Sequence, residues 1–555
     1  MIRTQVLIVG AGPVGLVTAL MLEKLGIDHE LVERRATLHA APQAHVLSSR
    51  TLEICRGIGV GDAPIRQAGP SPADTAHVRW VDRLIGRDLG VFSMGRDPSA
   101  IQRMLTHTPT PTTNLSQDQF EQHLFAHLPD PSKVRFEHTW QDVETAGDDY
   151  VSTVRNARGE DVTIHSRYLI GADGAGSAVR KAMGARMLGP DNIQTFVNIH
   201  FNANLREQLR GREGLLYWVM DEALTGTFIA HDIEQNWIFM KAVAADEPTD
   251  PIDHEKFAAL LRDAIGADVD FKINSMNAWR MTSQISDLYQ ADRLFLIGDA
   301  AHRFPPTGGI GMNTGFQDAH NLAWKIALVE GGCAQTLLDT YGIERKPVAE
   351  TNAAQSHANA MKMAEVARAL DTDGDHRISM GDIDRVLADP TLSAQVQEAV
   401  DRQAAHFNMS GLDLGFCYQS HAVRSEGAPP QSDDPVSHYL PSTTPGARLP
   451  HAWLQHGDTA LSTLDLVTYG RFLVLAGRQD AELEAALSHL QQAGYPIDLA
   501  VVAAESDLAP ADEAFADLFG EGTLLVRPDG HIAARFTASA GEALPEVMTR
   551  LFPRA

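Results

Sequence analysis

The sequence predicts an α/β protein of several domains, because three stretches of the chain carry distinct patterns of secondary structure. A short apolar strand pattern at residues 6–9 leads directly into a glycine-rich turn and a helical pattern. Residues 181–290 alternate apolar and polar positions with aromatic side chains among them, which is typical of an antiparallel sheet. Residues 446–555 return to alternating strand and helix patterns and contain a hairpin signal. At 555 residues the chain is too long for one core, so about three or four domains are expected.

The first glycine-rich turn, Gly10-Ala11-Gly12-Pro13-Val14-Gly15, has the spacing of a dinucleotide-binding fingerprint. Gly10 allows a tight turn, Gly12 lets a pyrophosphate approach the backbone, and Gly15 lets the helix pack closely on the strand. The helix that follows turns its free N–H groups and the positive end of its dipole toward the phosphates. The alternative is a glycine-rich turn in an ordinary α/β protein.

An acidic residue stands where this fingerprint requires one. A second strand pattern, residues 29–32, ends at Glu33, whose carboxylate is placed to accept the ribose hydroxyls of an adenine dinucleotide. Arg34 follows it and is assigned to the same cofactor site.

Two later strand patterns also end in turns that suit a polar cofactor. Residues 168–171 lead into Asp173-Gly174, which could bend the backbone near a pyrophosphate, although such a turn is more often structural. Residues 293–297 lead into Gly298-Asp299 and then a glycine-rich loop that opens a long helix. An acid at the carboxyl end of a strand beside a helix N-terminus favours cofactor binding.

Composition excludes several classes of protein. The net charge is −26, from 46 basic and 72 acidic residues, which makes nucleic acid and anionic membranes poor partners. No apolar run approaches the roughly 20 residues needed to span a bilayer, so no membrane span is expected. The three cysteines, Cys55, Cys333 and Cys417, form no CxxC pair, so neither a disulfide framework nor a zinc site is indicated. These features predict a cytoplasmic protein.

With the three glycine-rich turns in this order, the chain resembles the single-component FAD-dependent aromatic hydroxylases (class A flavoprotein monooxygenases). The resemblance covers residues 4–352 and resumes at 412–418. Three phrases, at residues 42–45, 216–219 and 448–453, resemble the phenol and chlorophenol hydroxylases and the polyketide hydroxylases within that family.

The resemblance implies an α/β architecture in three parts. A Rossmann-like FAD-binding domain of the glutathione-reductase type is expected at 1–180 and 291–350, interleaved with an antiparallel-sheet substrate domain at 181–290 to which 70–105 contribute. A helical connector at 351–425 and a linker at 426–445 then lead to a thioredoxin-like domain at 446–555 without a CxxC motif. Such a domain cannot exchange disulfides, so packing or dimer contact is its expected role, in a monomer or a homodimer.

The resemblance also implies a reaction. NAD(P)H would reduce FAD, O2 would add to it, and a flavin C4a-hydroperoxide would hydroxylate a phenolic or polycyclic aromatic substrate. The alternatives are a flavin-binding protein without monooxygenase turnover and a related FAD-dependent oxidase or epoxidase.

Positions carried over from the family give each residue an expected role. Glu33 would hold the adenosine ribose, Arg50 and Gln117 would lie along the ribityl and pyrophosphate groups, and Asp299 would bind the ribityl chain. The helix that starts near Gly311 would direct N–H groups at the flavin N1/O2 edge, with Pro306 near the reactive carbon. The remaining cofactor-site residues implied by the motifs are Gly10, Gly12, Pro13, Val14, Gly15, Arg34, Asp173, Gly174, Gly309, Met312 and Asn313. Gln43 stands where many relatives have a basic residue, which leaves the nicotinamide contacts there open.

Substrate-side residues are predicted from chemistry. A phenolate is a better nucleophile than a phenol, so a base near the substrate hydroxyl is expected, and His45 is the candidate. The alternative is a structural, hydrogen-bonded histidine. Tyr217 and Trp218 are candidate pocket residues, although aromatic side chains on a sheet are more often part of the core.

Residues 371–382 match the loop of an EF-hand calcium site. The acids Asp371, Asp373, Asp375 and Asp382 occupy loop positions one, three, five and twelve, and the carbonyl of Arg377 occupies position seven. His376 replaces the usual glycine, which disfavours the sharp turn. The hypotheses are a weak calcium site that acts on stability and an acidic connector between helices.

Overall fold

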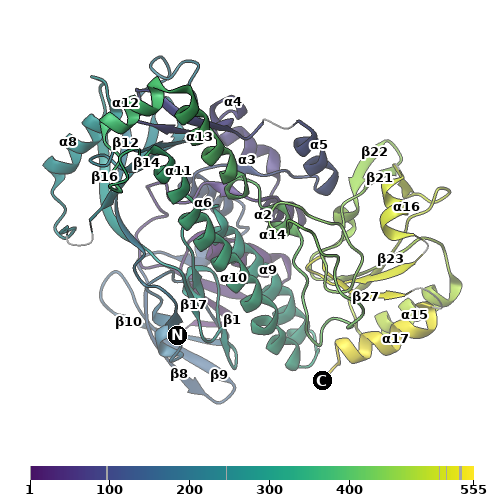
Figure 1. Cartoon of the computed structure of the whole chain (residues 1–555). Helices are drawn as coiled ribbons and strands as arrows, with labels where there is room; N and C mark the ends of the chain where they lie inside the picture. Colours follow the sequence, from purple (N-terminus) through teal and green to yellow (C-terminus); the bar gives the residue numbers. More distant parts are fainter. Residues whose placement is uncertain (1, 96–97, 245–246, 512, 521, 537–539) are drawn as a thin grey trace.

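The computed structural model describes residues 2–95, 98–244, 247–511, 513–520, 522–536 and 540–555 (Figure 1). The N-terminal sheet has the strand order β18–β19–β10–β1–β2–β7, and the β8–β9 hairpin joins it through β10. The pairs from β19 to β7 are parallel. The strands are β1 (Ile2–Val9), β2 (His29–Val32), β7 (Val134–Arg135), β8 (Thr139–Ala146), β9 (Asp149–Arg155), β10 (Asp161–Gly171), β18 (Gln290–Ala291) and β19 (Leu294–Leu296).

Helices pack on this sheet to form the largest apolar core. The helix α1 (Pro13–Lys24) follows β1 and packs against α9 (Ile310–Glu330), and α10 (Thr336–Lys362) packs on α9 in turn. The buried strand residues Leu7, Ile8 and Ile170 are fully enclosed, as expected for a parallel sheet covered on both faces. Further elements of this half of the chain are α2 (Ser49–Ile58), α3 (Asp62–Ala68), α4 (Pro72–Thr75), α5 (Pro98–His107), α6 (Gln117–Ala126), α7 (Ala178–Ala182), η1 (Pro131–Lys133), η2 (Gly298–Ala300), β3 (Val46–Leu47), β6 (Thr113–Asn114), β11 (Met187–Leu188), β17 (Gln284–Ser286) and β20 (His302–Arg303).

The middle of the chain forms a second sheet, with the order β16–β12–β15–β14–β13–β4–β5. Its neighbouring strands are antiparallel except for the parallel pair β13–β4. One face packs on α8 (His254–Ile265), with Val197, Ile199 and Phe201 of β12 buried there. Because side chains alternate along a strand, the intervening residues face the opposite side. The strands are β4 (His77–Val81), β5 (Asp88–Ser93), β12 (Gln194–Asn202), β13 (Leu216–Val219), β14 (Gly226–Asp232), β15 (Asn236–Val243) and β16 (Lys272–Met281).

A helical segment after α10 covers one edge of this sheet. Val366, Ile383 and Val400 from three of its helices are buried together with Trp80 and Trp218 of the sheet. The segment contains α11 (Ala364–Leu370), α12 (Met380–Ala388), α13 (Pro390–Asp401), η3 (Arg402–His406) and α14 (Ser410–Leu414).

The C-terminal part is a separate α/β layer, which lies beside α9 and α10 (yellow in Figure 1). Its sheet has the order β24–β23–β26–β27, with β23 and β24 parallel and β26 and β27 antiparallel, as in a thioredoxin-like core. The elements are β21 (Trp453–His456), β22 (Thr459–Ser462), η4 (Thr463–Leu466), β23 (Phe472–Ala476), α15 (Ala481–Gln492), β24 (Ile497–Val501), β25 (Ala509–Pro510), α16 (Ala514–Phe519), β26 (Thr523–Val526), β27 (Ile532–Phe536) and α17 (Ala540–Leu551). The predicted fold class is confirmed. Within the described ranges, no helix has the length and apolar content to cross a membrane.

Candidate active site

A cavity of about 2960 Å³ lies where the two large sheets meet the helical segment. Its floor is built by the turns that follow β1, β10 and β19, and one wall is the second face of the seven-stranded sheet. The turns come together because the strands end level: Val9 pairs with both Val32 and Gly171, and Gly171 pairs with Leu296. Residues that follow these strand ends therefore gather at one edge of the parallel sheet, where polar cofactors bind in such folds.

The turn after β1 leaves open space for a ligand. A Cβ atom added to Gly12 or Gly174 would meet nothing within 4 Å, and both residues line the cavity. Gly15 is different, since its added Cβ would lie 1.9 Å from the carbonyl oxygen of Gly10. Gly15 thus serves helix packing, while Gly12 keeps the cradle open, as the fingerprint predicts. Asp173 also lines the cavity, and its buried Oδ1 has no hydrogen-bond partner among the described residues.

Glu33 is held in a fixed position beside this cradle. Its Oε2 accepts a hydrogen bond from the N–H of Ala11 at 2.8 Å, and its Oε1 accepts from the N–H and the Nε of Arg35, each at 2.9 Å. Burial alone would raise the pKa of Glu33, but the hydrogen bonds from Arg35 and Ala11 outweigh it and lower the pKa. The side chain is therefore an ionised acceptor at the edge of the cavity, with Arg34 exposed next to it.

Asp299 projects into the cavity from the short helix η2, and its side chain is accessible from the cavity. Desolvation by the surrounding protein raises the pKa of this carboxyl, and electrostatic interactions with the nearby His302 and Arg303 partly offset the rise. A buried carboxylate holds the turn in place: Asp318 Oδ2 accepts from the N–H of Gly298 at 3.1 Å and is 2.7 Å from Nε2 of His302. Asp318 was not predicted as a site residue. It lies on α9, one turn after Thr314, and its contact with the turn at Gly298 depends on how α9 packs in the fold.

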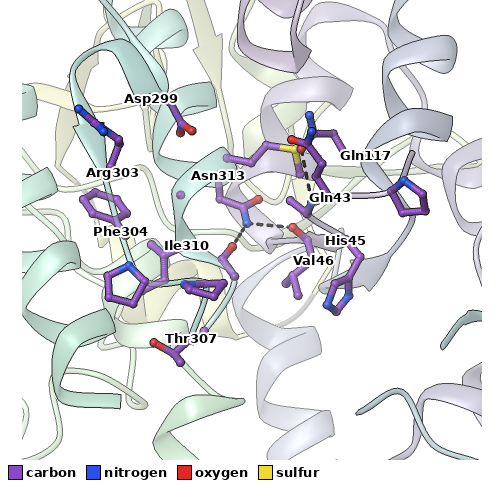
Figure 2. A pocket seen from close by; sticks show the side chains of 18 of the residues that line it. Gln43, His45, Val46, Gln117, Asp299, Arg303, Phe304, Thr307, Ile310 and Asn313 are labelled. Atoms are coloured by element: carbon purple, nitrogen blue, oxygen red, sulfur yellow. Dashed lines mark hydrogen bonds between the residues drawn. The ribbon is translucent and has the colours of Figure 1, made fainter. Parts of the chain in front are cut away.

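The N-terminus of α9 faces the cavity and is joined to β3. Asn313 donates from Nδ2 to the carbonyls of Val46 at 2.9 Å and Gly309 at 2.6 Å (Figure 2). Its Oδ1 accepts from the N–H of Ser48. Gly309 has a φ of +65°, which glycine tolerates at this helix start. The predicted residues that line the cavity here are Pro306, Gly309, Gly311, Met312 and Asn313.

Figure 2 shows Asp299 and Arg303 on one side of Asn313, with Gln43, His45 and Gln117 on the other. Gln117 lines the cavity, and its Nε2 donates to Glu121 at 2.9 Å. Arg50 does not reach the cavity lining. Its guanidinium donates to Glu53 at 3.2 Å and to the carbonyl of Asp529 at 2.7 Å, so the expected contact with the cofactor is replaced by a link to the C-terminal part. Arg50 is not part of the cavity lining because its side chain leaves α2 in a different direction from those of Ser48 and Ser49, which do line the cavity.

The sheet wall of the cavity is aromatic and polar. Phe196 and Trp279 stack with ring centroids 5.1 Å apart, and Trp279 Nε1 donates to Asn198 Oδ1 at 2.7 Å. Both rings line the cavity, as does His200. None of these residues was predicted, although the alternation from Gln194 to His200 contains the signal.

Of the two predicted aromatic pocket residues, the structure places one at the cavity. Trp218 lines it and meets Trp80 edge-on at 4.4 Å. Tyr217 is fully buried on the opposite face of the sheet, where its hydroxyl donates to the carbonyl of Arg212 at 2.9 Å. Adjacent residues of a strand face opposite sides, so both could not line one cavity. The Tyr217 prediction is wrong.

His45 lies at the junction of the floor and the sheet wall. Its Nδ1 is 3.0 Å from Asn114 Oδ1, which assigns the Nδ1 proton to a hydrogen bond and leaves Nε2 as a lone-pair site. The ring meets His231 edge-on, with centroids 5.5 Å apart. Burial lowers the pKa of His45, and burial together with His45 and His200 lowers that of His231 well below its usual value. Both imidazoles are neutral at pH 7.

The calcium hypothesis for residues 371–382 is not supported by the geometry. Arg385 forms ion pairs with Asp373 at 2.5 Å and Asp382 at 2.7 Å, so a guanidinium takes the place that a cation would have. Asp382 also accepts from the N–H and Oγ of Ser379, the N-cap of α12, in a capping box, and Asp371 accepts from the N–H of Gly374. His376 nevertheless adopts the sharp turn, with a φ of +66°. Among the residues that the structure describes, no acidic or histidine cluster could hold a metal ion.

Comparison with known proteins agrees with this geometry. Residues 3–356 match a family described as FAD binding domain, and residues 442–555 match the C-terminal domain of aromatic-ring hydroxylases. The chain belongs to the FAD-binding aromatic-ring hydroxylases. It is an FAD-dependent monooxygenase, which confirms the class predicted from the three glycine-rich turns.

Relatives match over almost the whole chain. A 4-methyl-5-nitrocatechol 5-monooxygenase from a Burkholderia species is 32% identical over 96% of this chain and 94% of its own. A tetracenomycin A2 monooxygenase-dioxygenase from Streptomyces glaucescens is 32% identical over 98% of this chain and 94% of its own. The solved structure of the flavin-dependent monooxygenase PieE in complex with FAD and substrate has a TM-score of 0.92 and 32% identity, and covers 99% of both chains.

Proposed function

We propose that the protein hydroxylates a phenolic or polycyclic aromatic compound with NAD(P)H and O2 as co-substrates. The observation that supports this most strongly is the continuity of one cavity from the dinucleotide cradle at Gly12 and Glu33 to the aromatic wall at Phe196 and Trp279. Such a cavity brings a redox cofactor and a flat substrate into one enclosed space. When bound, FAD supplies the chemistry: reduced by NAD(P)H, it delivers one oxygen atom of O2 to the ring, and the other leaves as water.

Residues of the floor would hold the cofactor. Glu33 would accept the adenosine ribose hydroxyls, the open cradle at Gly12 and Gly174 would admit the pyrophosphate, and Asp299 would accept ribityl hydroxyls. The N–H groups at the start of α9 near Gly311 would stabilise negative charge on the ring system. Arg303, which lines the cavity beside Asp299, adds positive charge there.

His45 would remove the proton of the substrate hydroxyl. Asn114 orients the ring and holds the Nδ1 proton, and the lowered pKa keeps Nε2 free to accept a proton at neutral pH. His231 would steady the ring from its edge. In this arrangement the phenol gives its proton to His45 as its oxygen becomes the electron-donating phenolate.

The test is a panel of phenols and naphthols added to the FAD-loaded enzyme, with NADPH oxidation and product formation both followed. We expect NADPH oxidation to be stimulated by at least one compound, with a hydroxylated product of 16 Da greater mass. His45→Asn should retain FAD and lower the rate of product formation by about 10²-fold or more, with less product per NADPH oxidised. A flavoprotein that forms no product with any compound would instead support flavin binding without monooxygenase turnover.

Asp299→Ala should weaken FAD retention by about 10-fold or more, because a charge-assisted hydrogen bond is worth about 1.5–3 kcal/mol. The measurement is flavin occupancy after dialysis, by absorbance. A matched control is Asp292→Ala, at an exposed carboxylate that accepts from Tyr150 outside the cavity lining. Equal flavin occupancy in the two variants would remove Asp299 from the cofactor site.

We further propose that the enzyme is cytoplasmic, where a reducing environment suits its three free cysteines, and that it is a monomer or a homodimer.

A further inference from the structure

The helical segment between the two matched family domains builds one wall of the cavity. Residues 357–441 lie between the matches at 3–356 and 442–555, yet the segment contributes Met363, Ala367, His406 and Phe407 to the lining. It is fixed to the edge of the sheet, since Gln397 accepts from the N–H of Val91 at 3.1 Å and donates to its carbonyl at 3.0 Å. This wall lies at the other end of the sheet from Phe196 and Trp279. The helical segment packs on β13, β4 and β5 at one edge, whereas β12 and β16 lie at the other edge.

His406, the last residue of η3, is the polar group within this wall. His406 is only 7% exposed. Its ring stacks on that of Phe407 with centroids 4.9 Å apart and is tilted against the ring of Trp218 with centroids 5.5 Å apart. Its buried Nδ1 has no hydrogen-bond partner in the described part of the chain. Burial lowers the pKa of His406 to about 4, so the ring is neutral and carries one donor and one acceptor nitrogen.

We infer that His406 determines substrate specificity by forming a hydrogen bond to a second oxygen of a flat aromatic substrate, at the end of the cavity formed by the helical segment. The inference rests on the proposed function and names a feature of the substrate: a hydroxyl or carbonyl remote from the ring that is hydroxylated. A phenylalanine would fill the same space between Trp218 and Phe407 without leaving a buried polar atom unpaired. Because Nδ1 is enclosed, the hydrogen bond to a substrate oxygen would be formed by Nε2, at the nitrogen of this cavity-lining ring that is not buried without a partner. Phenylalanine could not form it, whereas Trp218 and Phe407 would contact the face of the ring system.

The alternative is a histidine that serves only to fill space in an aromatic cluster. The two roles differ in what they do to ligands. A space-filling ring affects all flat ligands equally, whereas a hydrogen-bonding ring discriminates between ligands that carry or lack the second oxygen.

The experiment compares 1-naphthol with 1,5-, 1,6-, 1,7-, 2,6- and 2,7-dihydroxynaphthalene as ligands of the FAD-loaded enzyme, with binding followed by perturbation of the flavin absorption. We expect at least one diol to bind the wild type about 3- to 10-fold more tightly than the mono-ol, the range of one hydrogen bond. His406→Phe should abolish that preference while it changes binding of 1-naphthol by less than about 2-fold. His406→Gln should restore part of it, and Phe407→Leu should weaken all ligands alike.

A diol preference that persists in His406→Phe, or a wild type without preference for any diol, overturns the inference and leaves the proposed function intact. If no compound of the phenol and naphthol panel perturbs the flavin or stimulates NADPH oxidation in the wild type, the proposed function fails and the inference with it. A melting temperature of His406→Phe equal to or above that of the wild type shows that the variant is folded.

Discussion

Asp413 illustrates how the charge of one carboxyl depends on its surroundings in the cavity. Its Oδ2 accepts from the N–H of Arg50 at 3.0 Å, yet burial raises its pKa to about 6. The folded-state pKa lies above the usual value near 4, so the folded protein loses stability as pH rises through about 4 to 6. We expect Asp413→Asn to raise the Tm of the FAD-loaded enzyme by about 1–3 °C at pH 8, where the wild-type carboxyl is charged, and by less at pH 5. Thermal melts at the two pH values measure this.

The matched control is Asp433→Asn, at an exposed carboxyl. It should leave Tm unchanged at both pH values. A pH-independent gain for Asp413→Asn would show that the charge of Asp413 is not the cause.

Elements differ in how far the sequence alone could predict them. The three turns that form the floor were predictable, because their glycines and acids lie next to the strands that place them, as with Gly10 to Glu33. The side of the sheet on which Tyr217 lies could not be predicted, since the orientation of β13 depends on its pairing with β4, which is far away in the chain. The wall at His406 could not be predicted either, because it depends on how α13 docks on β5.

In the α11–α12 connection, a residue outside the EF-hand-like motif forms the contacts that a calcium ion was expected to form. Arg385, outside the twelve-residue loop, neutralises Asp373 and Asp382. We expect the wild-type Tm to be the same in millimolar calcium and in chelator. Arg385→Gln should lower Tm by about 1 °C or less, since the exposed Arg385–Asp373 pair contributes about 0–1 kcal/mol and the buried Asp382 keeps its hydrogen bonds from Ser379. Arg402→Gln, at another exposed pair, is the control. A calcium-dependent rise in the wild-type Tm would restore the calcium site.

At the scale of the whole molecule, buried ion pairs join the C-terminal part to α10 and α9. Arg527 donates to Glu344 Oε2 at 2.9 Å and to Asp529 Oδ2 at 2.6 Å, and Lys325 donates to Glu344 at 2.8 Å. The side chains of Arg527, Lys325 and Glu344 are fully buried. Burial lowers the pKa of Lys325 to about 8, with the opposite charge of Glu344 holding it from falling further. Glu344 therefore balances two cations that have no access to water.

Glu344→Gln should accordingly destabilise the enzyme by about 3–5 kcal/mol, because it leaves uncompensated charge in a buried site. The C-terminal part contributes no residue to the cavity lining as described, which ends at Asp413. We therefore expect a large fall in Tm and faster proteolysis within residues 426–445, while FAD affinity at low temperature changes by less than about 3-fold. Glu207→Gln, at an exposed carboxylate paired with the exposed Arg210, is the control and should change neither. If proteolysis is unchanged while FAD is lost, Glu344 acts through α9 on the cofactor site instead of on docking of the C-terminal part.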